Sequence, residues 1–136
     1  MSSILQLYNQ QQRNNRMGDK INLKEKLTLF SEHWTPKIVG ELNEQYVKLA
    51  KVKGEMVWHD HENEDELFYI IKGQLLLKFR DKEVTLKEGD MYIVPRGVEH
   101  QPIAEEECHL LLFEPKSTAH TGDVESELTV KNLDWI

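Results

Sequence analysis

Short runs of alternating polar and apolar residues fill residues 37–114, which is the pattern of β-strands with one face toward a core. Turn-forming residues separate these runs at intervals of about 8–12 residues, a spacing typical of all-β sandwiches and barrels. The pattern therefore predicts an all-β fold whose barrel core spans about residues 37–114. The expected strands are residues 37–42, 45–53, 55–61, 66–72, 74–80, 82–86, 91–94 and 108–114, with a charged loop at residues 104–107.

One amphipathic segment precedes the strands. Asn22 is a good helix cap, and Leu23, Leu27 and Phe30 follow it at positions i, i+4 and i+7 of one apolar stripe. This spacing predicts a short helix near residues 22–30 that lies against the surface of the domain.

The two ends of the chain differ from its middle. Residues 1–16 are rich in Asn and Gln without a sustained period, which indicates a disordered tail, a frayed helix or an extension. Residues 17–136 are expected to form a single domain. Residues 128–133 are expected to add an edge strand, and Trp135 and Ile136 to pack onto the barrel or onto a partner chain.

The composition, 39% hydrophobic and 30% charged residues, is typical of a soluble globular protein. The longest apolar run is residues 67–71, far shorter than the roughly 20 residues of a transmembrane helix, so no membrane span is expected. The single cysteine excludes an internal disulfide, and the first residues lack the build of a secretory signal. Both observations favour the cytoplasm.

The charge is distributed unevenly. Residues 1–54 carry a net charge of +4 and residues 55–136 a net charge of −11, which gives the overall −7. An acidic body disfavours nucleic acid as a partner, because nucleic-acid binding needs a basic face.

Three ligands for a metal ion occur close together. His59 and His61 project to the same side of an extended chain, about 7 Å apart at the backbone, and imidazoles can converge from there on one ion. Glu66 follows after an acidic stretch that could bend the chain. A turn fixed by Pro95 and the nearby Gly97 would present His100 as a fourth ligand.

These residues resemble the two motifs of the cupin superfamily. The first motif is matched by Gly54, His59, His61, Glu66 and Gly73, with a spacer of four rather than five residues after Gly54. The second motif is matched by Gly89, Pro95, Gly97 and His100, with Ala104 where Asn is usual. That Asn is not a metal ligand, so its replacement leaves the predicted ligands His59, His61, Glu66 and His100 intact.

The resemblance implies a double-stranded β-helix, or jelly-roll barrel, with one divalent metal ion inside one mouth. The chain is most similar to small single-domain cupins described as like mannose-6-phosphate isomerase, a label that reports kinship of fold rather than reaction. The ligand set suits iron, manganese, nickel, copper or zinc, and the sequence does not distinguish among them.

Three further residues are candidates for binding a small molecule. Phe68 and Ile70 share strand parity with Glu66, so they line the interior either as plain core or as a surface for the ligand. Arg96 lies in the turn beside His100, either as an exposed charge or as a group that binds an acid.

Trp58 and Tyr69 fall on the opposite parity, which is the outer face of a closed barrel. Large aromatic side chains there suggest a surface for a partner, and cupins of this kind commonly form dimers. We therefore expect a homodimer with Trp58, Tyr69 or Trp135 at or near the interface.

Two kinds of function remain open. In the first, the metal centre acts on a small molecule, with isomerase-like or dioxygenase-like chemistry. In the second, the metal is structural or captures a ligand without turnover, so the protein is a binding module. The absence of an evident proton-transfer residue outside the four ligands favours the second slightly, and whether the protein is an enzyme stays undecided.

Overall fold

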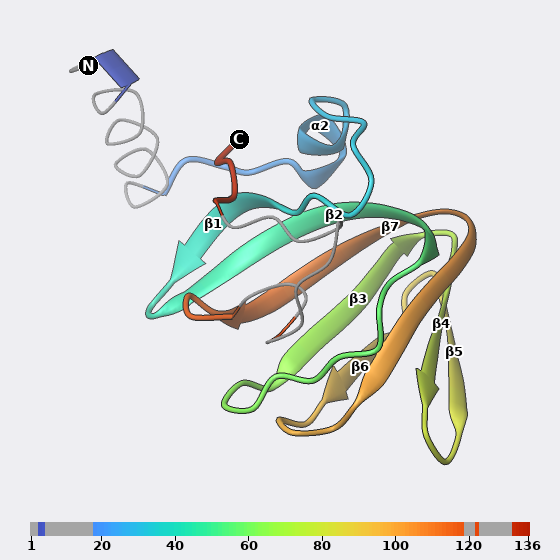
Figure 1. The fold of residues 1–136 in the computed structure, drawn as a ribbon. Helices are drawn as coiled ribbons and strands as arrows, with labels where there is room; N and C mark the ends of the chain where they lie inside the picture. The colour runs from blue at the N-terminus through green and yellow to red at the C-terminus, as the bar shows by residue number, and fades with distance from the viewer. Residues whose placement is uncertain (1–2, 5–17, 119–121, 123–131) are drawn as a thin grey trace.

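The computed structural model describes residues 3–4, 18–118, 122 and 132–136. Within these residues the chain forms one short helix before the barrel and seven strands, which confirms the predicted all-β fold (Figure 1). The elements are α2 (Leu23–Leu27), β1 (Lys37–Leu42), β2 (Gln45–Glu55), β3 (Glu66–Lys72), β4 (Gln74–Phe79), β5 (Glu83–Lys87), β6 (Met91–Val94) and β7 (His100–Pro115).

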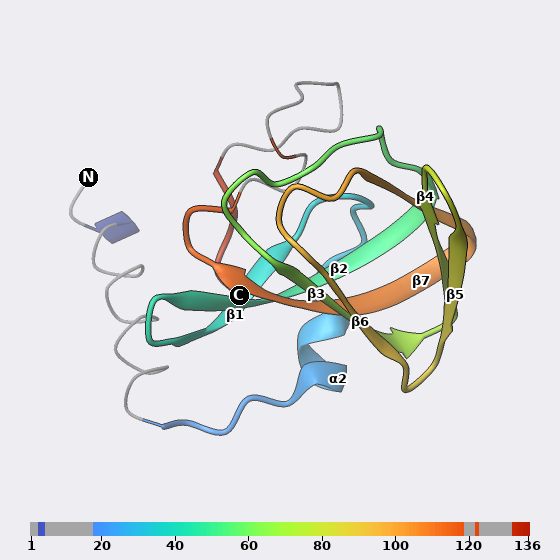
Figure 2. The same ribbon diagram turned by 90° about the horizontal axis from the view of Figure 1, so that it is seen from below.

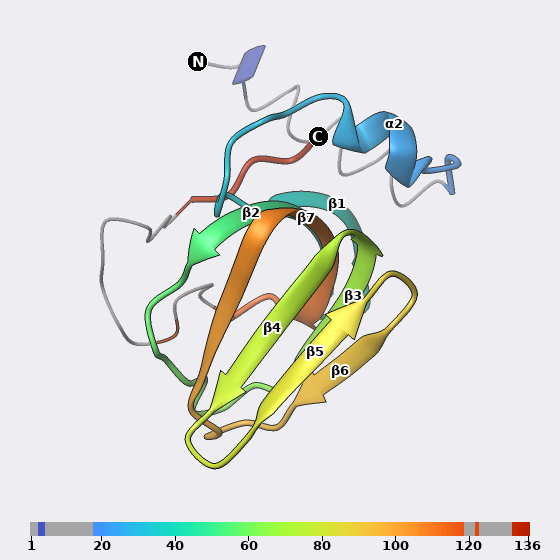
Figure 3. The same ribbon diagram turned by 90° about the vertical axis from the view of Figure 1, so that its right-hand side faces the viewer.

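Strand β7 connects the two sides of the barrel. All strand pairs are antiparallel, in the order β1-β2-β7-β3-β6, and β4 pairs with both β5 and β7. The second half of β7 pairs with β3, whereas its first half, from His100 to Ile103, pairs with β4. The 16 residues of β7 therefore bend across the molecule, and Figure 3 shows the β4–β5 hairpin in front of β2 and β7.

The core lies inside the barrel because alternate residues of each strand point inward. In β3, Glu66, Phe68 and Ile70 are buried, and in β7 alternate residues are buried on both sides of an exposed stretch. Phe68 and Ile70 therefore face the interior, as their parity predicted. Each fully buried aliphatic or aromatic side chain stabilises the fold by about 1.5–3 kcal/mol.

The helix is shorter than predicted but has the predicted cap. The Asn22 side chain accepts a hydrogen bond from the backbone N–H of Glu25 at 2.9 Å, and α2 ends at Leu27 rather than near residue 30. Leu27 and Phe30 pack with Val39 of β1 and Leu49 of β2 in a second apolar cluster. The helix therefore covers the outer face of β1 and β2, as Figure 1 shows.

Two predicted elements are wrong. Residues 55–61 do not form a strand, because β2 continues to Glu55 and the following segment makes only an isolated bridge between His59 and His100. Residues 104–107 are not a loop but part of β7, since Ala104 pairs with Gly54 and residues 105–107 lie in the register shift before Cys108 pairs with Val52. The three glutamates of this stretch are exposed to solvent, because residues in a bulge are not held in the regular alternation of the strand.

The last residues pack onto the barrel, as predicted. The Trp135 ring lies edge-on to the Tyr46 ring with 5.6 Å between their centres. The backbone N–H of Ile136 donates to the Ile38 carbonyl at 3.0 Å, which places the C-terminus beside β1 (Figure 2). The predictions for residues 1–16 and for a strand at residues 128–133 concern segments that lie mostly outside the described residues.

No helix within the described part of the chain is long and apolar enough to cross a membrane.

Candidate metal centre

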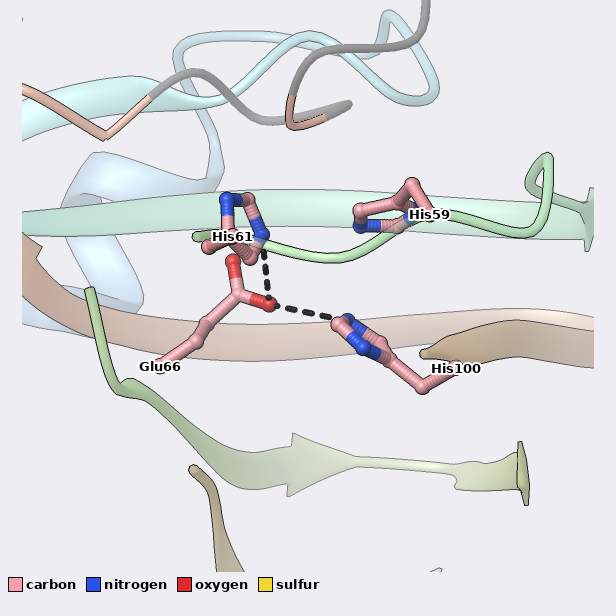
Figure 4. A group of neighbouring side chains, drawn as sticks. All are labelled: His59, His61, Glu66 and His100. Atoms are coloured by element: carbon pink, nitrogen blue, oxygen red, sulfur yellow. Dashed lines mark hydrogen bonds and ion pairs between the residues drawn. The ribbon is translucent and has the colours of Figure 1, made fainter. Parts of the chain in front are cut away.

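Four side chains from three separate segments meet in the interior. His59 and His61 come from the segment between β2 and β3, Glu66 begins β3 and His100 begins β7. One potential ligand atom of each lies within 4.8 Å of one another, and all four residues are buried. Figure 4 shows the three rings directed toward the Glu66 carboxylate. The structure thus brings together the four residues that the sequence singled out.

Glu66 occupies the middle of the group. Its Oε1 atom lies 3.3 Å from Nε2 of His61 and 3.3 Å from Nε2 of His100, the two contacts drawn in Figure 4. The His59 and His100 rings are the closest pair, with 4.4 Å between their centres. A single carboxylate oxygen therefore faces two imidazole nitrogens, and all three side chains are buried.

Backbone bonds fix two of the histidines. The backbone N–H of His59 donates to the His100 carbonyl at 3.0 Å, and that of His100 donates back to the His59 carbonyl at 2.9 Å. The turn after β6 is tied to the same segment, because the Gly97 N–H donates to the His61 carbonyl at 2.8 Å. Gly97 has φ 76°, a backbone conformation that glycine adopts without strain. The Pro95–Gly97 turn thus helps to place the histidines on both sides.

The ring tautomers leave nitrogen lone pairs facing the centre. Nδ1 of His59 lies 2.8 Å from the Val57 carbonyl oxygen, and Nδ1 of His100 lies 2.9 Å from that of Val98. A carbonyl oxygen only accepts, so each Nδ1 donates and carries the ring proton. Nε2 of a neutral ring then presents a lone pair, which is the arrangement that metal-binding histidines show.

The donor set fits a cation. A lone pair on Nε2 of His100 and the Oε1 atom of Glu66 are both acceptors, and at 3.3 Å they repel unless a proton or a metal ion lies between them. Within the described chain, Nδ1 of buried His61 has no hydrogen-bond partner, and its Nε2 has only the 3.3 Å contact with Glu66. A divalent ion would satisfy these groups together, because imidazole nitrogen and carboxylate oxygen are ordinary ligands of transition metals.

The electrostatics point the same way. Burial favours the neutral form of Glu66, but contacts with His100 and His61 outweigh it and hold the pKa of Glu66 well below its usual value. Burial alone would lower the pKa of His61, but the Glu66 carboxylate outweighs it and raises that pKa. Burial and the neighbouring His100 lower the pKa of His59 to about 4. The carboxylate is thus ionised and attracts positive charge.

A cavity adjoins the four-residue group. It encloses about 370 Å³ of empty space, part of it open to solvent. Phe68 lines this cavity, whereas Ile70 is core that does not reach it. Arg96 is exposed and does not line the cavity, so its role as an acid-binding residue remains a prediction that this geometry does not support. The lining residues are Trp34, Pro36, Ala50, Val52, Met56, His59, Glu66, Phe68, Pro102, Leu110 and Leu112.

Sequence reasoning missed a buried ion pair next to the site. Nζ of Lys48 lies 2.8 Å from Oε1 of Glu114, and the two side chains are 1% and 0% exposed. Burial and the charge of Glu66 raise the pKa of Glu114 to about 8, although Lys48 acts in the opposite direction. Strand parity could have revealed this pair. Lys48 lies two residues from inward-facing Ala50, and Glu114 two residues from inward-facing Leu112, so both side chains point inward.

The chain matches known proteins along most of the barrel. The family described as "Cupin domain" matches residues 46–114. The crystal structure of a cupin-2 domain containing protein from Shewanella frigidimarina is 47% identical with a TM-score of 0.70, and the match covers 71% of this chain and 94% of that chain.

Two curated proteins match at lower coverage. "Uncharacterized protein YdbB" of Bacillus subtilis is 40% identical over 80 residues, which is 58% of this chain and 65% of that protein. "3-hydroxyanthranilate 3,4-dioxygenase 2" of Aspergillus fumigatus is 31% identical over 92 residues, 62% of this chain and 47% of that protein. The chain therefore spans less than two thirds of the length of either protein.

Proposed function

Because this chain belongs to the cupin family, we propose that its barrel holds one divalent metal ion at which a small molecule binds. The ligands would be His59, His61, Glu66 and His100. The observation that carries the proposal is the contact of one Glu66 oxygen with two imidazole nitrogens at 3.3 Å inside a buried site.

The protein's own groups have distinct roles in this proposal. The Val57 and Val98 carbonyls hold the His59 and His100 rings so that Nε2 faces inward. Glu66 offsets part of the ion's charge, which lowers the cost of holding a cation in a closed interior. When bound, the ion supplies a Lewis acid that polarises an oxygen of the ligand, or a centre for oxygen chemistry if it is iron.

Of the two chemistries expected from the sequence, dioxygenase-like chemistry is the better supported. The support is the 31% identity to a protein named as a 3-hydroxyanthranilate 3,4-dioxygenase, together with an apolar cavity beside the metal ligands. The second candidate is a binding module without turnover. It is favoured by one observation, that the only titratable side chains lining the cavity within the described chain are His59 and Glu66.

The test begins with elemental analysis of protein purified without added metal. We expect about one divalent ion per chain, and we expect H61A and H100A to lose it while their circular dichroism stays that of a β protein. H109A is the matched control, because His109 contacts Glu107 on the surface and should keep the metal. Unchanged metal content in both H61A and H100A would contradict the proposed centre.

Oxygen uptake separates the two candidates. Metal-loaded protein is screened with small aromatic diols and aminophenols in an oxygen electrode. Consumption that H100A abolishes supports dioxygenase chemistry. Binding of these compounds without uptake supports the binding module.

We also propose that two copies pair through the outer face of β3 and β6. Tyr69, Met91 and Ile93 are 38%, 57% and 49% exposed, and Tyr69 lies opposite Met91 in the sheet. Strand β6 pairs only with β3 within the described chain, so this apolar face ends at a strand edge. The other aromatics predicted for the interface are engaged, Trp58 under Arg80 and Trp135 on Tyr46.

A cytoplasmic location remains a proposal as well. It rests on the single cysteine of the chain, which is buried and leaves no disulfide partner.

A further inference from the structure

The cavity beside the four-residue group is apolar almost throughout. Nine of the eleven described residues that line it are apolar, and the two others, His59 and Glu66, are members of the group itself. A ligand in this cavity therefore meets polar atoms only where it meets the proposed metal centre. The rest of its surface is in contact with aliphatic and aromatic side chains, which cannot satisfy a charge or a row of hydroxyl groups.

Among the described residues that line the cavity, none is a lysine or arginine that could pair with a charged ligand. Two buried cations flank this lining in sequence, Lys37 and Lys48, and each already contacts a glutamate side chain, at 2.9 Å and 2.8 Å. Neither residue reaches the cavity surface. A phosphate or carboxylate group on the part of the ligand that lies away from the proposed metal centre would therefore lose its hydration without gaining a partner. Such a loss is strongly unfavourable.

One wall of the cavity comes from outside the segment that matches the family. Trp34 lies between α2 and β1, upstream of residues 46–114, and is 9% exposed. Its backbone has φ 57°, a conformation that non-glycine residues adopt only where other contacts hold it. Two hydrogen bonds hold Trp34 here. Its backbone N–H donates to the Lys51 carbonyl at 2.9 Å, and its indole N–H donates to the Lys53 carbonyl at 2.8 Å.

We propose that Trp34 is a specificity-determining residue, and that the cavity selects a small uncharged molecule with an apolar body and one polar group. This inference rests on the proposed function, since the polar group would lie toward the metal centre. The indole ring closes the apolar side of the cavity, and the two backbone acceptors on β2 fix its orientation.

The charge preference is tested with two ligands of the same shape. The compounds 4-methylphenol and 4-hydroxybenzoate differ only in a methyl group against a carboxylate at the end opposite the hydroxyl. In metal-free protein, where no ion can bind the carboxylate, we expect 4-methylphenol to bind at least about tenfold more tightly by calorimetry. Glucose 6-phosphate is expected not to bind. Equal or tighter binding of 4-hydroxybenzoate or glucose 6-phosphate overturns the substrate class.

The role of Trp34 is tested by two substitutions and a matched control. W34F keeps an aromatic wall and should bind 4-methylphenol within about threefold of wild type, whereas W34G should weaken binding at least about tenfold. Glycine accepts the backbone angle of this position, so W34G removes the ring without adding strain. W58A is the control, because Trp58 stacks on Arg80 and does not line the cavity. Unchanged binding in W34G would overturn the role of Trp34.

Metal content separates this inference from the proposed function. W34F and W34G should each retain about one ion per chain, because Trp34 is not among the four proposed ligands. A protein that holds no metal, yet discriminates the two phenols as expected, refutes the metal centre and leaves the cavity inference standing. A protein that binds the ion when metal is supplied, but whose metal-free form prefers 4-hydroxybenzoate, supports the metal centre and refutes the cavity inference.

Discussion

Glu66 makes the two neighbouring histidines behave differently toward protons. It raises the pKa of His61, whereas burial and His100 lower the pKa of His59 to about 4. Only the neutral imidazole coordinates a metal, so a proton competes with the ion at each ring. Of these two rings, His61 is therefore the one that takes up a proton at the higher pH, and His59 stays neutral, and so able to coordinate the proposed ion, at lower pH.

Zinc affinity should fall as pH decreases, and the fall should begin above the ordinary imidazole pKa of 6.5. The sign follows from the raised pKa of His61, which takes up its proton earlier than a free histidine. Competition with a chromogenic chelator between about pH 8 and pH 5 measures this, with H109A as the control. A constant affinity from about pH 8 down to pH 6 would show that His61 is not a ligand.

Cys108 should be chemically inert in the folded protein. Burial raises the pKa of its thiol to about 12, so only about one molecule in ten thousand carries the reactive thiolate at pH 8. We expect no labelling by iodoacetamide under native conditions and one label per chain in guanidinium chloride, both measured by mass spectrometry. Native protein that labels as fast as the unfolded chain would refute this burial.

At the scale of elements, the buried pair of Lys48 and Glu114 joins β2 to β7. K48M should destabilise the fold by about 1–3 kcal/mol, because the Glu114 carboxyl is then buried without its partner. The cost stays in this range because Glu114 has a pKa raised to about 8 and can remain protonated. Urea denaturation of the single variant measures the change in free energy of unfolding.

The double variant K48M/E114L is the control for this contact. Removing both charged groups leaves no orphaned carboxyl, so it should recover most of the lost stability. If the double variant is no more stable than K48M, the loss arises from packing at Lys48 rather than from the broken pair.

Strand parity and the two motifs predicted the features that depend on local sequence. The inward direction of Phe68 and Ile70 follows from alternation along one strand, and the structure confirms it. The gathering of His59 and Glu66 with His100 required the family resemblance, because no local pattern brings residue 100 beside residue 59.

The errors arose where pairing between distant strands decides the outcome. Residues 104–107 carry three charges and look like a loop, but Ala104 pairs with Gly54 and Cys108 with Val52, which keeps the stretch in β7. Lys48 and Glu114 are 66 residues apart, so no local pattern indicates that their side chains meet. Trp34 was missed for the same reason, since its place in the cavity wall depends on two carbonyls of β2.

At the scale of the whole molecule, we expect a dimer. Light scattering at micromolar concentration should give about twice the chain mass of 16.0 kDa. M91E should give the monomer, because it places a charge in the exposed face of β6. L29E is the matched control, since Leu29 is 62% exposed after α2 and should leave the dimer intact. A wild-type mass near 16 kDa would contradict the proposed interface.

The length of β7 has a consequence for how the protein is made. Strand β2 finds its main partner only when residues 103–115 have been synthesised, about sixty residues after β2 itself. Until then, the edges of β2 and β3 that pair with β7 have no partner strand. Pairing between strands so far apart in sequence forms slowly. We therefore expect an aggregation-prone interval during synthesis, and His100, the last of the four proposed ligands, is made as part of the strand that ends this interval.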